Sequence, residues 1–324
     1  MRRSRAAAVG VAAALLCAAC PAYGFSARAA LGPTAVRVLR RPPLVTAVAV
    51  AAAAVAMPDG PTPQHPLPAP WPYVTVGSKV VNLYSVVFLA VNIIGLCVAY
   101  PLLAVAYTFS FLFDRKRRRA MDAVVALWAR LCLTLFFFSR VRVEGVENLP
   151  PRGQAALYTP NHCSFLDIFS LSGFLPRPLK YVSKVEILRI PLIGWAMQLA
   201  GHIALRRTDR RSQLATFRDS VECLKNGNNL VTFAEGTRSP TGVLGEFKAG
   251  PFKIASFAGV PVVPISIVNT QFAMPVVSMF PIRRAWNVRI VIHPPISTAG
   301  RDSNDVCAEA RAAVNSGLPE WMRS

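Results

Sequence analysis

A histidine and an aspartate five residues apart are the first residues of this 324-residue chain whose types and spacing predict chemistry. His162 and Asp167 lie in the sequence Asn-His-Cys-Ser-Phe-Leu-Asp, directly after an apolar stretch over 155–159. An imidazole is the usual general base at neutral pH, and it needs a partner that fixes its tautomer and stabilises the imidazolium. Asp167 fits that role, because it falls about one turn into a helix that Ser164 can cap.

This pair allows a substrate hydroxyl to attack an acyl group directly, without an acylated enzyme. Cys163 and Ser164 stand beside His162 and offer a covalent alternative. Side chains that are adjacent in the sequence rarely face each other on a helix, so direct attack is favoured. Taken alone, the spacing also fits an ordinary histidine near a capped helix.

A second motif, Phe-Ala-Glu-Gly-Thr-Arg-Ser over 233–239, follows the strand-like residues 230–233. Glycine lets the main chain approach an anion closely, and arginine can bind a phosphate with two parallel hydrogen bonds. Gly236 and Arg238 therefore indicate a phosphate site. A solvated Glu-Arg pair at a strand end is the alternative for this motif alone, and the combination of both motifs disfavours it.

Together with two further blocks, these motifs resemble the glycerolipid acyltransferase family, specifically the lysophosphatidate (1-acylglycerol-3-phosphate) acyltransferases of plastid and bacterial type. One block begins at Lys184 and ends in Leu-Arg-Arg at Arg207, and the other is Val-Pro-Val-Val-Pro over 260–264. The resemblance covers about residues 141–295. Many relatives carry an acidic residue where this chain has Arg206, so the roles of the individual arginines stay open.

What the resemblance implies is an acyl transfer from a thioester to the sn-2 hydroxyl of lysophosphatidate, with His162 as base and Asp167 as its partner. The residues implied to bind the acceptor are Lys184, Arg207, Glu235, Gly236, Thr237 and Arg238. The three basic residues would hold the phosphate, and Glu235 would contact glycerol hydroxyls. No metal and no resident cofactor are implied, and the co-substrate would be acyl-carrier protein or acyl-coenzyme A. Alternatives are a glycerol-3-phosphate or other lysophospholipid acyltransferase, or a non-catalytic lipid-binding protein.

From residue 141 onward, short apolar strands alternate with helical stretches. The strand-like stretches are 155–159, 230–233, 262–267 and 288–292, and the helix-like stretches are 166–174, 211–226 and 303–316. This alternation predicts an α/β sandwich around a mostly parallel sheet. We assign the acyltransferase domain to residues 139–324.

Residues 80–138 are predicted to anchor the protein to a membrane. Residues 80–113 carry no charged side chain, and a span needs roughly 20 apolar residues. The stretch could form one tilted helix or two shorter helices broken near Pro101, and the basic run Arg115–Arg119 could contact lipid headgroups. Residues 121–138 look interfacial or protein-packed. The alternative is a buried helical hairpin of a soluble protein.

The overall charge of +20 fits either nucleic acid or an anionic membrane surface. The long uncharged run favours the membrane, and no recognised nucleic-acid-binding motif is present. The expected partners are therefore membrane lipids and not nucleic acid. The seven cysteines do not form the pattern of a disulfide framework.

The first 57 residues contain seven arginines and no acidic residue, which is typical of targeting segments. Residues 1–24 read as a signal peptide, 25–57 as a transit peptide, and 58–79 as a proline-rich linker. A signal peptide, then Phe25, then a transit peptide resembles the presequence of algae with secondary plastids. We therefore expect a plastid membrane protein, with the endoplasmic reticulum as the alternative.

Overall fold

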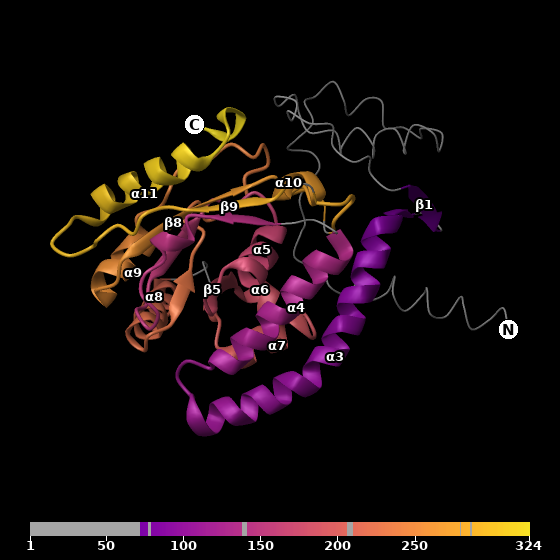
Figure 1. Ribbon diagram of the computed structural model, residues 1–324, viewed down its shortest axis with the longest axis horizontal. Helices are drawn as coiled ribbons and strands as arrows, with labels where there is room; N and C mark the ends of the chain where they lie inside the picture. The colour runs from indigo at the N-terminus through magenta and orange to yellow at the C-terminus, as the bar shows by residue number, and fades with distance from the viewer. Residues whose placement is uncertain (1–71, 77–78, 138–140, 206–209, 279, 286) are drawn as a thin grey trace.

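The computed structural model describes residues 72–324 apart from 77–78, 138–140, 206–209, 279 and 286. These residues form a long helical hairpin that packs along an α/β domain (Figure 1). The predicted signal peptide over 1–24, the transit peptide over 25–57 and most of the linker lie outside the described residues. Arg207 lies outside them as well.

The expected linker over 58–79 is wrong at its C-terminal end. Strand β1 (Tyr73–Val76) pairs antiparallel with β2 (Lys79–Asn82). The reason is local composition, because Tyr, Val and Thr favour a strand as soon as the proline-dense stretch ends.

Helix α3 (Leu83–Phe113) follows directly, and the side chain of Asn82 caps it by accepting hydrogen bonds from two main-chain amides. It is one continuous helix that contains Pro101 and visibly bends along its course (Figure 1). Among the described residues, it is the one helix that is long and apolar enough to cross a membrane. Its apolar outer face is exposed, including Ile94, Val98, Leu102, Val105, Phe109, Leu112 and Phe113. That exposure does not fit a buried hairpin of a soluble protein.

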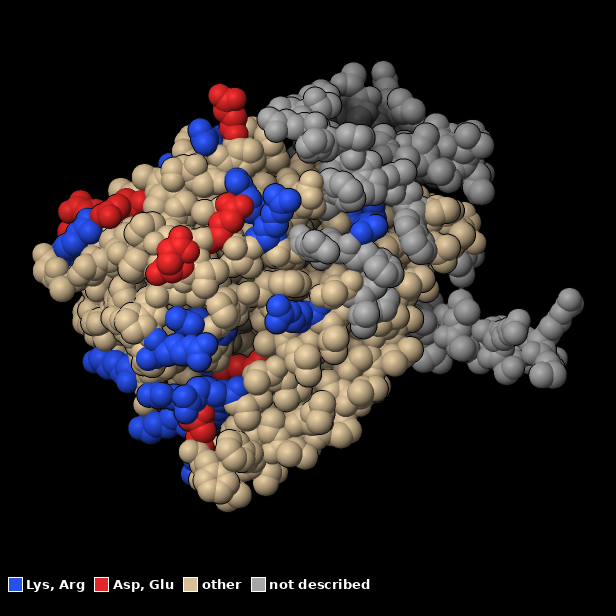
Figure 2. All heavy atoms as spheres, viewed as in Figure 1, with Lys and Arg blue, Asp and Glu red and all other residues tan. Residues whose placement is uncertain are grey.

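Helix α4 (Arg119–Phe137) runs back along α3 and packs on α5 (Leu166–Phe174). Contacts to the catalytic domain extend along the whole of α3. Near its start, Ser85 Oγ donates to the carbonyl of Pro281, and in its middle the Tyr100 hydroxyl donates to the carbonyl of Leu192. The surface over the outer side of α3 carries few charged side chains, whereas Lys and Arg gather toward α8 (Figure 2).

The basic turn between α3 and α4 contacts protein rather than standing free. Arg117 Nε donates to the carbonyl of Asn226 at 2.9 Å, just after α8 (Arg210–Lys225), and Arg118 Nη1 donates to that of Leu199 at 2.8 Å, in α7 (Ile193–Ala200). Carbonyl groups at helix C-termini lack partners within the helix and attract cations. These contacts give the two arginines a structural role, and headgroup contact stays a prediction for the turn.

A buried ion pair joins the hairpin to the sheet. Lys180 Nζ lies 2.7 Å from both carboxylate oxygens of Asp122 in α4 and 2.7 Å from the carbonyl of Ala200. Beside it, His202 Nδ1 accepts from the amide of Tyr181, and burial lowers the pKa of His202 to about 3. His202 is thus a neutral structural residue.

The domain is built on a seven-stranded sheet in the order β3-β9-β8-β4-β7-β5-β6. The strands are β3 (Arg142–Glu144), β4 (Leu157–Pro160), β5 (Leu179–Lys184), β6 (Ile203–Leu205), β7 (Asn229–Val231), β8 (Val262–Val268) and β9 (Arg289–Ile292). All neighbouring strands are parallel except β8 and β9. The predicted mostly parallel sheet is confirmed.

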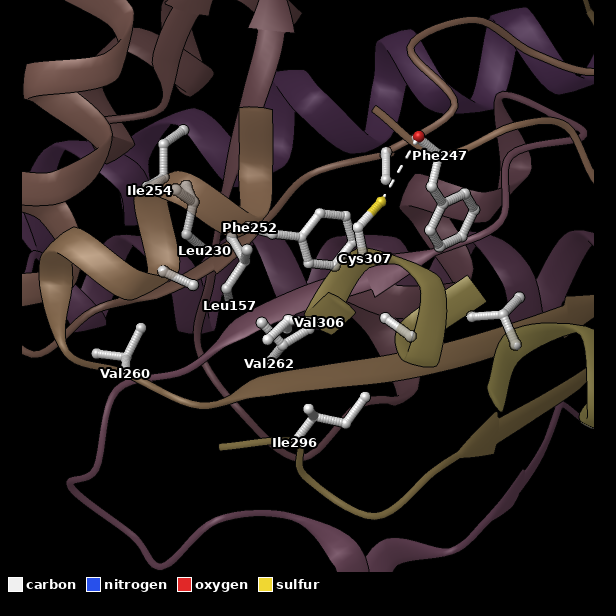
Figure 3. Packing of buried hydrophobic residues seen from close by; sticks show 14 of the residues in the cluster. Leu157, Leu230, Phe247, Phe252, Ile254, Val260, Val262, Ile296, Val306 and Cys307 are labelled. Atoms are coloured by element: carbon white, nitrogen blue, oxygen red, sulfur yellow. Dashed lines mark hydrogen bonds between the residues drawn. The ribbon is translucent and has the colours of Figure 1, made fainter. Parts of the chain in front are cut away.

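Helices cover both faces of this sheet. Alternate strand residues point to opposite sides, so Leu157 and Leu230 face α8, α9 (Gly250–Ala258) and α11 (Ser303–Gly317), whereas Tyr158 and Val231 face the α5 side. Figure 3 shows the first of these cores, in which Phe252 packs among strand residues. The remaining short helices are α6 (Val185–Leu188), α10 (Thr270–Ala273) and two 3₁₀ turns, Val146–Asn148 and Glu320–Met322.

Candidate active site

Four neighbouring parallel strands bring the sequence motifs to one edge of the sheet. Strands β4, β7, β5 and β6 are consecutive in the sheet, so their carboxyl ends lie side by side. His162 follows β4, the motif from Glu235 to Arg238 follows β7, and Lys184 is the last residue of β5. Ligands of open α/β sheets bind at this edge. Arg207 follows β6 in the sequence, outside the described residues.

At the centre of this edge, His162 Nδ1 lies 2.8 Å from Asp167 Oδ2. The same oxygen accepts from the amides of Cys163 and Ser164, each at 2.9 Å, and Oδ1 accepts from the Thr270 hydroxyl. Asp167 is fully buried, so these donors fix its position and satisfy its charge. Because Nδ1 donates to the carboxylate, Nε2 carries the lone pair of the neutral imidazole.

The His162 ring is held by stacking and remains accessible. Phe233 lies against it with ring centroids 3.7 Å apart and an interplanar angle of 19°. The His162 side chain is 14% exposed, and Nε2 has no hydrogen-bond partner within the described part of the chain. An oriented imidazole with a free Nε2 is the geometry that a general base needs.

Cys163 and Ser164 do not fit the covalent alternative. Both side chains are buried, and burial raises the pKa of the Cys163 thiol well above its ordinary value. Ser164 Oγ donates to the carbonyl of Met274 at 2.8 Å and accepts from the amide of Leu166 at 3.2 Å. These contacts give Ser164 the predicted capping role at α5.

Asn161 anchors the loop that carries His162. Its side-chain amide donates to the carbonyl of Ile267 at 2.9 Å and accepts from the amide of the same residue at 2.7 Å. This two-bond contact continues the pairing of β4 with β8 beyond the end of the strand. Neither Asn161 nor Phe233 had been given a role from the sequence, although both stand inside the motifs.

The turn of the second motif brings Arg238 next to the loop that carries His162. Gly236 has a φ of 79°, which favours glycine, and its amide donates to the carbonyl of Phe233. The amide of Ser239 then donates to the carbonyl of His162 at 2.8 Å. Within the described residues, no acidic side chain pairs with Arg238.

Thr237 and Lys184 are exposed at the same edge, and in the described part of the chain the ammonium group of Lys184 has no ion pair either. Unpaired cations at the carboxyl edge are suited to an anionic ligand. The structure thus brings His162, Asp167, Lys184 and the second motif to one edge.

Glu235 connects this turn to two other loops. Its Oε1 accepts from the amide of His162 at 2.6 Å, and its Oε2 accepts from the amide of Gly245 at 3.0 Å. Burial raises the pKa of Glu235 to about 7. Through the first of these hydrogen bonds, the carboxylate contacts the main chain of His162 directly.

Comparisons with known proteins agree with this geometry. The family model described as acyltransferase matches residues 140–268. The chain is 38% identical over 245 residues to a chloroplastic 1-acyl-sn-glycerol-3-phosphate acyltransferase of Arabidopsis thaliana, covering 76% of this chain and 66% of the relative. A chloroplastic 1-acyl-sn-glycerol-3-phosphate acyltransferase of Brassica napus is 38% identical, with 76% of this chain and 69% of the relative covered. A 1-acyl-sn-glycerol-3-phosphate acyltransferase of Chlamydomonas reinhardtii is 42% identical, with 64% and 61% covered.

Among solved structures, the chain resembles the 1-acyl-sn-glycerophosphate acyltransferase PlsC of Thermotoga maritima. The TM-score is 0.59 at 28% identity, covering 72% of this chain and 96% of that one. The chain spans about two thirds of the length of the curated relatives that it matches. On this shared fold and sequence, the chain belongs to the 1-acyl-sn-glycerol-3-phosphate acyltransferase family.

Proposed function

We propose that this chain is an enzyme that transfers an acyl group from a thioester to the sn-2 hydroxyl of lysophosphatidate, forming phosphatidate. The observation that carries this proposal is the His162–Asp167 pair on the same edge as the unpaired Arg238. The names of the relatives support the same reaction.

In the proposed mechanism, Nε2 of His162 takes the proton of the sn-2 hydroxyl while that oxygen attacks the thioester carbonyl. Asp167 holds Nδ1–H and stabilises the imidazolium. The tetrahedral intermediate then expels the thiolate, which takes the proton back from the imidazolium. No acyl-enzyme is needed, which agrees with the burial of Cys163 and Ser164.

Arg238 and Lys184 are proposed to hold the acceptor phosphate, with Arg207 as a third cation. Support comes from the exposure of Lys184 and the proximity of the Arg238 segment to the base loop through the Ser239–His162 contact. A guanidinium fixes the orientation of a phosphate, so it would also fix the hydroxyl that reacts.

The exposed apolar face of α3 is proposed to rest against a bilayer. Extracting the lipid acceptor into water would cost about 0.8 kcal/mol for each CH₂ group exposed. A site held against the membrane avoids that cost. The chloroplastic names of two relatives support a plastid membrane, and the endoplasmic reticulum is the alternative.

The function is tested by assaying purified residues 58–324 with lysophosphatidate, glycerol 3-phosphate and lysophosphatidylcholine. Each acceptor is offered with acyl-carrier protein and with coenzyme A as the acyl donor. Lysophosphatidate should be acylated fastest, at the sn-2 position, and the two donors separate the two co-substrates. Faster acylation of another acceptor, or binding of lipid without turnover, would contradict the proposal.

A further inference from the structure

The Glu235 carboxylate joins its own turn to two other main-chain segments, 73 and 10 residues away in the sequence. It follows β7, and its two oxygens accept from main-chain amides in two other loops, those of His162 and Gly245. The contact to the catalytic loop is short, at 2.6 Å. When the carboxyl group is ionised, these hydrogen bonds are about twice as strong as neutral ones. Burial raises the pKa of Glu235 to about 7, so this ionisation falls near neutral pH. Glu235 is thus the side chain that holds the main-chain amide of His162 in place.

The surroundings of Glu235 are closed on the side of Gly245. The residue is 8% exposed, and a Cβ added at Gly245 would lie 2.9 Å from Oε2. Arg311 Nε donates to the carbonyl of Gly245 at 3.2 Å, which holds this loop from the other side. The carboxylate therefore sits in a fitted space made by main chain.

Lysophosphatidate offers little for Glu235 to bind. Its glycerol carries one free hydroxyl, at sn-2, and in the proposed reaction Nε2 of His162 takes the proton of that hydroxyl. A carboxylate that already accepts from two amides would have to share the same hydroxyl with the base. The contacts of Glu235 therefore favour a role beneath the loop over a role as a glycerol ligand.

We propose that Glu235 is a positioning residue that holds the main chain of His162 in register with the phosphate-binding turn, and that it does not contact the acceptor. This inference rests on the proposed acyl transfer. The consequence is kinetic. Weakening the hydrogen bonds that this carboxylate accepts should lower kcat and leave the KM for the acceptor unchanged. A displacement of about 1 Å at a reacting group can cost about 10²-fold in rate.

The test compares Glu235→Gln with Glu222→Gln in the purified enzyme. Glutamine has the size of glutamate but offers one acceptor oxygen and an NH₂ donor, so one of the two amides loses its partner. Glu222 is an exposed glutamate in α8 that has no ion pair within the described residues, and it controls for the loss of one negative charge. We expect Glu235→Gln to lower kcat by about 10- to 100-fold, with the KM for lysophosphatidate within about twofold and Glu222→Gln unchanged.

Gly245→Ala supplies a second variant should Glu235→Gln fail to fold. It leaves the carboxylate in place but crowds Oε2, so the same loss in kcat at constant KM is expected. A raised KM with normal kcat in Glu235→Gln would overturn the positioning role and favour direct contact with the acceptor. Wild-type enzyme without lysophosphatidate turnover would instead contradict the proposed function itself.

Discussion

Two pairs of charged or ionisable side chains differ in their exposure. The His162–Asp167 pair at the carboxyl edge of the sheet is partly exposed, and we call it the open pair. The Lys180–Asp122 pair between the helical hairpin and the sheet is enclosed, and we call it the closed pair. Asp167 and Asp122 are both buried carboxylates that contact a basic side chain at 2.7–2.8 Å. The His162 side chain keeps 14% of its surface exposed, whereas that of Lys180 keeps 3% and makes a further bond to a carbonyl. An open pair can exchange a proton with a substrate, but a closed pair can only hold two elements together.

The same contrast separates the arginines. Arg238 stands at the open edge without an acidic partner in the described residues, whereas Arg118 donates to carbonyls of α7. Composition alone does not distinguish these cations, because all add equally to the net charge. Their surroundings decide which of them remain available to a ligand.

The largest expected effect is the loss of the open pair. His162→Ala should lower kcat by about 10²- to 10⁴-fold, because the general base is removed. The fold should persist, because the Asp167 carboxylate keeps its hydrogen bonds to the amides of Cys163 and Ser164 and to the Thr270 hydroxyl. Turnover with saturating substrates and thermal unfolding are the two measurements. Cys163→Ala is the control and should stay active, so a trapped acyl-enzyme on Cys163 would contradict direct attack.

Breaking the closed pair should affect stability and spare chemistry. Lys180→Met leaves the Asp122 carboxylate buried without its partner, at a cost of about 3–5 kcal/mol in the free energy of unfolding. Chemical denaturation of the variant measures this loss. The double variant Lys180→Met/Asp122→Leu should regain most of it, because no uncompensated charge remains. A stable single variant with low kcat would place this pair in the reaction instead.

Removing the open arginine should weaken acceptor use. Arg238→Ala should raise the KM for lysophosphatidate by about 10- to 100-fold, since a hydrogen bond to a charged group is worth about 1.5–3 kcal/mol. Arg238→Lys should fall between, because a point charge does not replace a planar fork. Arg152→Ala, an exposed arginine before β4, should match wild type. Unchanged kinetics in Arg238→Ala would move the phosphate site elsewhere.

The smallest expected effect concerns Arg118, whose guanidinium group donates to carbonyl groups of the protein. Arg118→Met removes a cation from the C-terminal end of α7, which should cost about 0.3–1 kcal/mol of stability. Kinetics and binding to anionic vesicles should stay as in wild type. A salt-sensitive loss of vesicle binding would show that Arg118 serves headgroups after all.

Much of the fold follows from local sequence. Helices α8 and α11 agree with the prediction within one residue at each end, because apolar periodicity marks them. Helix α5 begins and ends at the predicted residues, and Ser164 marks its start. Strands β3, β5 and β6 of the seven-stranded sheet were not predicted, and β3 has only three residues. Lys180 and Lys184 interrupt the apolar pattern of β5, and β6 has only three residues.

The site divides in the same way. The His162–Asp167 contact follows from a spacing of five residues, which one turn of helix converts into a hydrogen bond. The Lys180–Asp122 pair joins residues 58 positions apart, and the Thr270–Asp167 bond joins residues 103 positions apart. No periodic pattern encodes such distances, because they depend on how the hairpin and the sheet pack together.

One consequence follows from the attachment of α3 along its whole length. Ser85 near its start, Tyr100 in its middle and the turn after its end all contact the catalytic domain. A helix that keeps these contacts carries the α/β domain with it, so we expect it to enter one leaflet rather than to span a hydrocarbon core of about 30 Å. On this expectation, the exposed face of α3 lies in a single leaflet. We therefore expect phosphatidate to be released into the leaflet that supplied its precursor, so that lipid made here accumulates on one side of the membrane until a transbilayer carrier redistributes it.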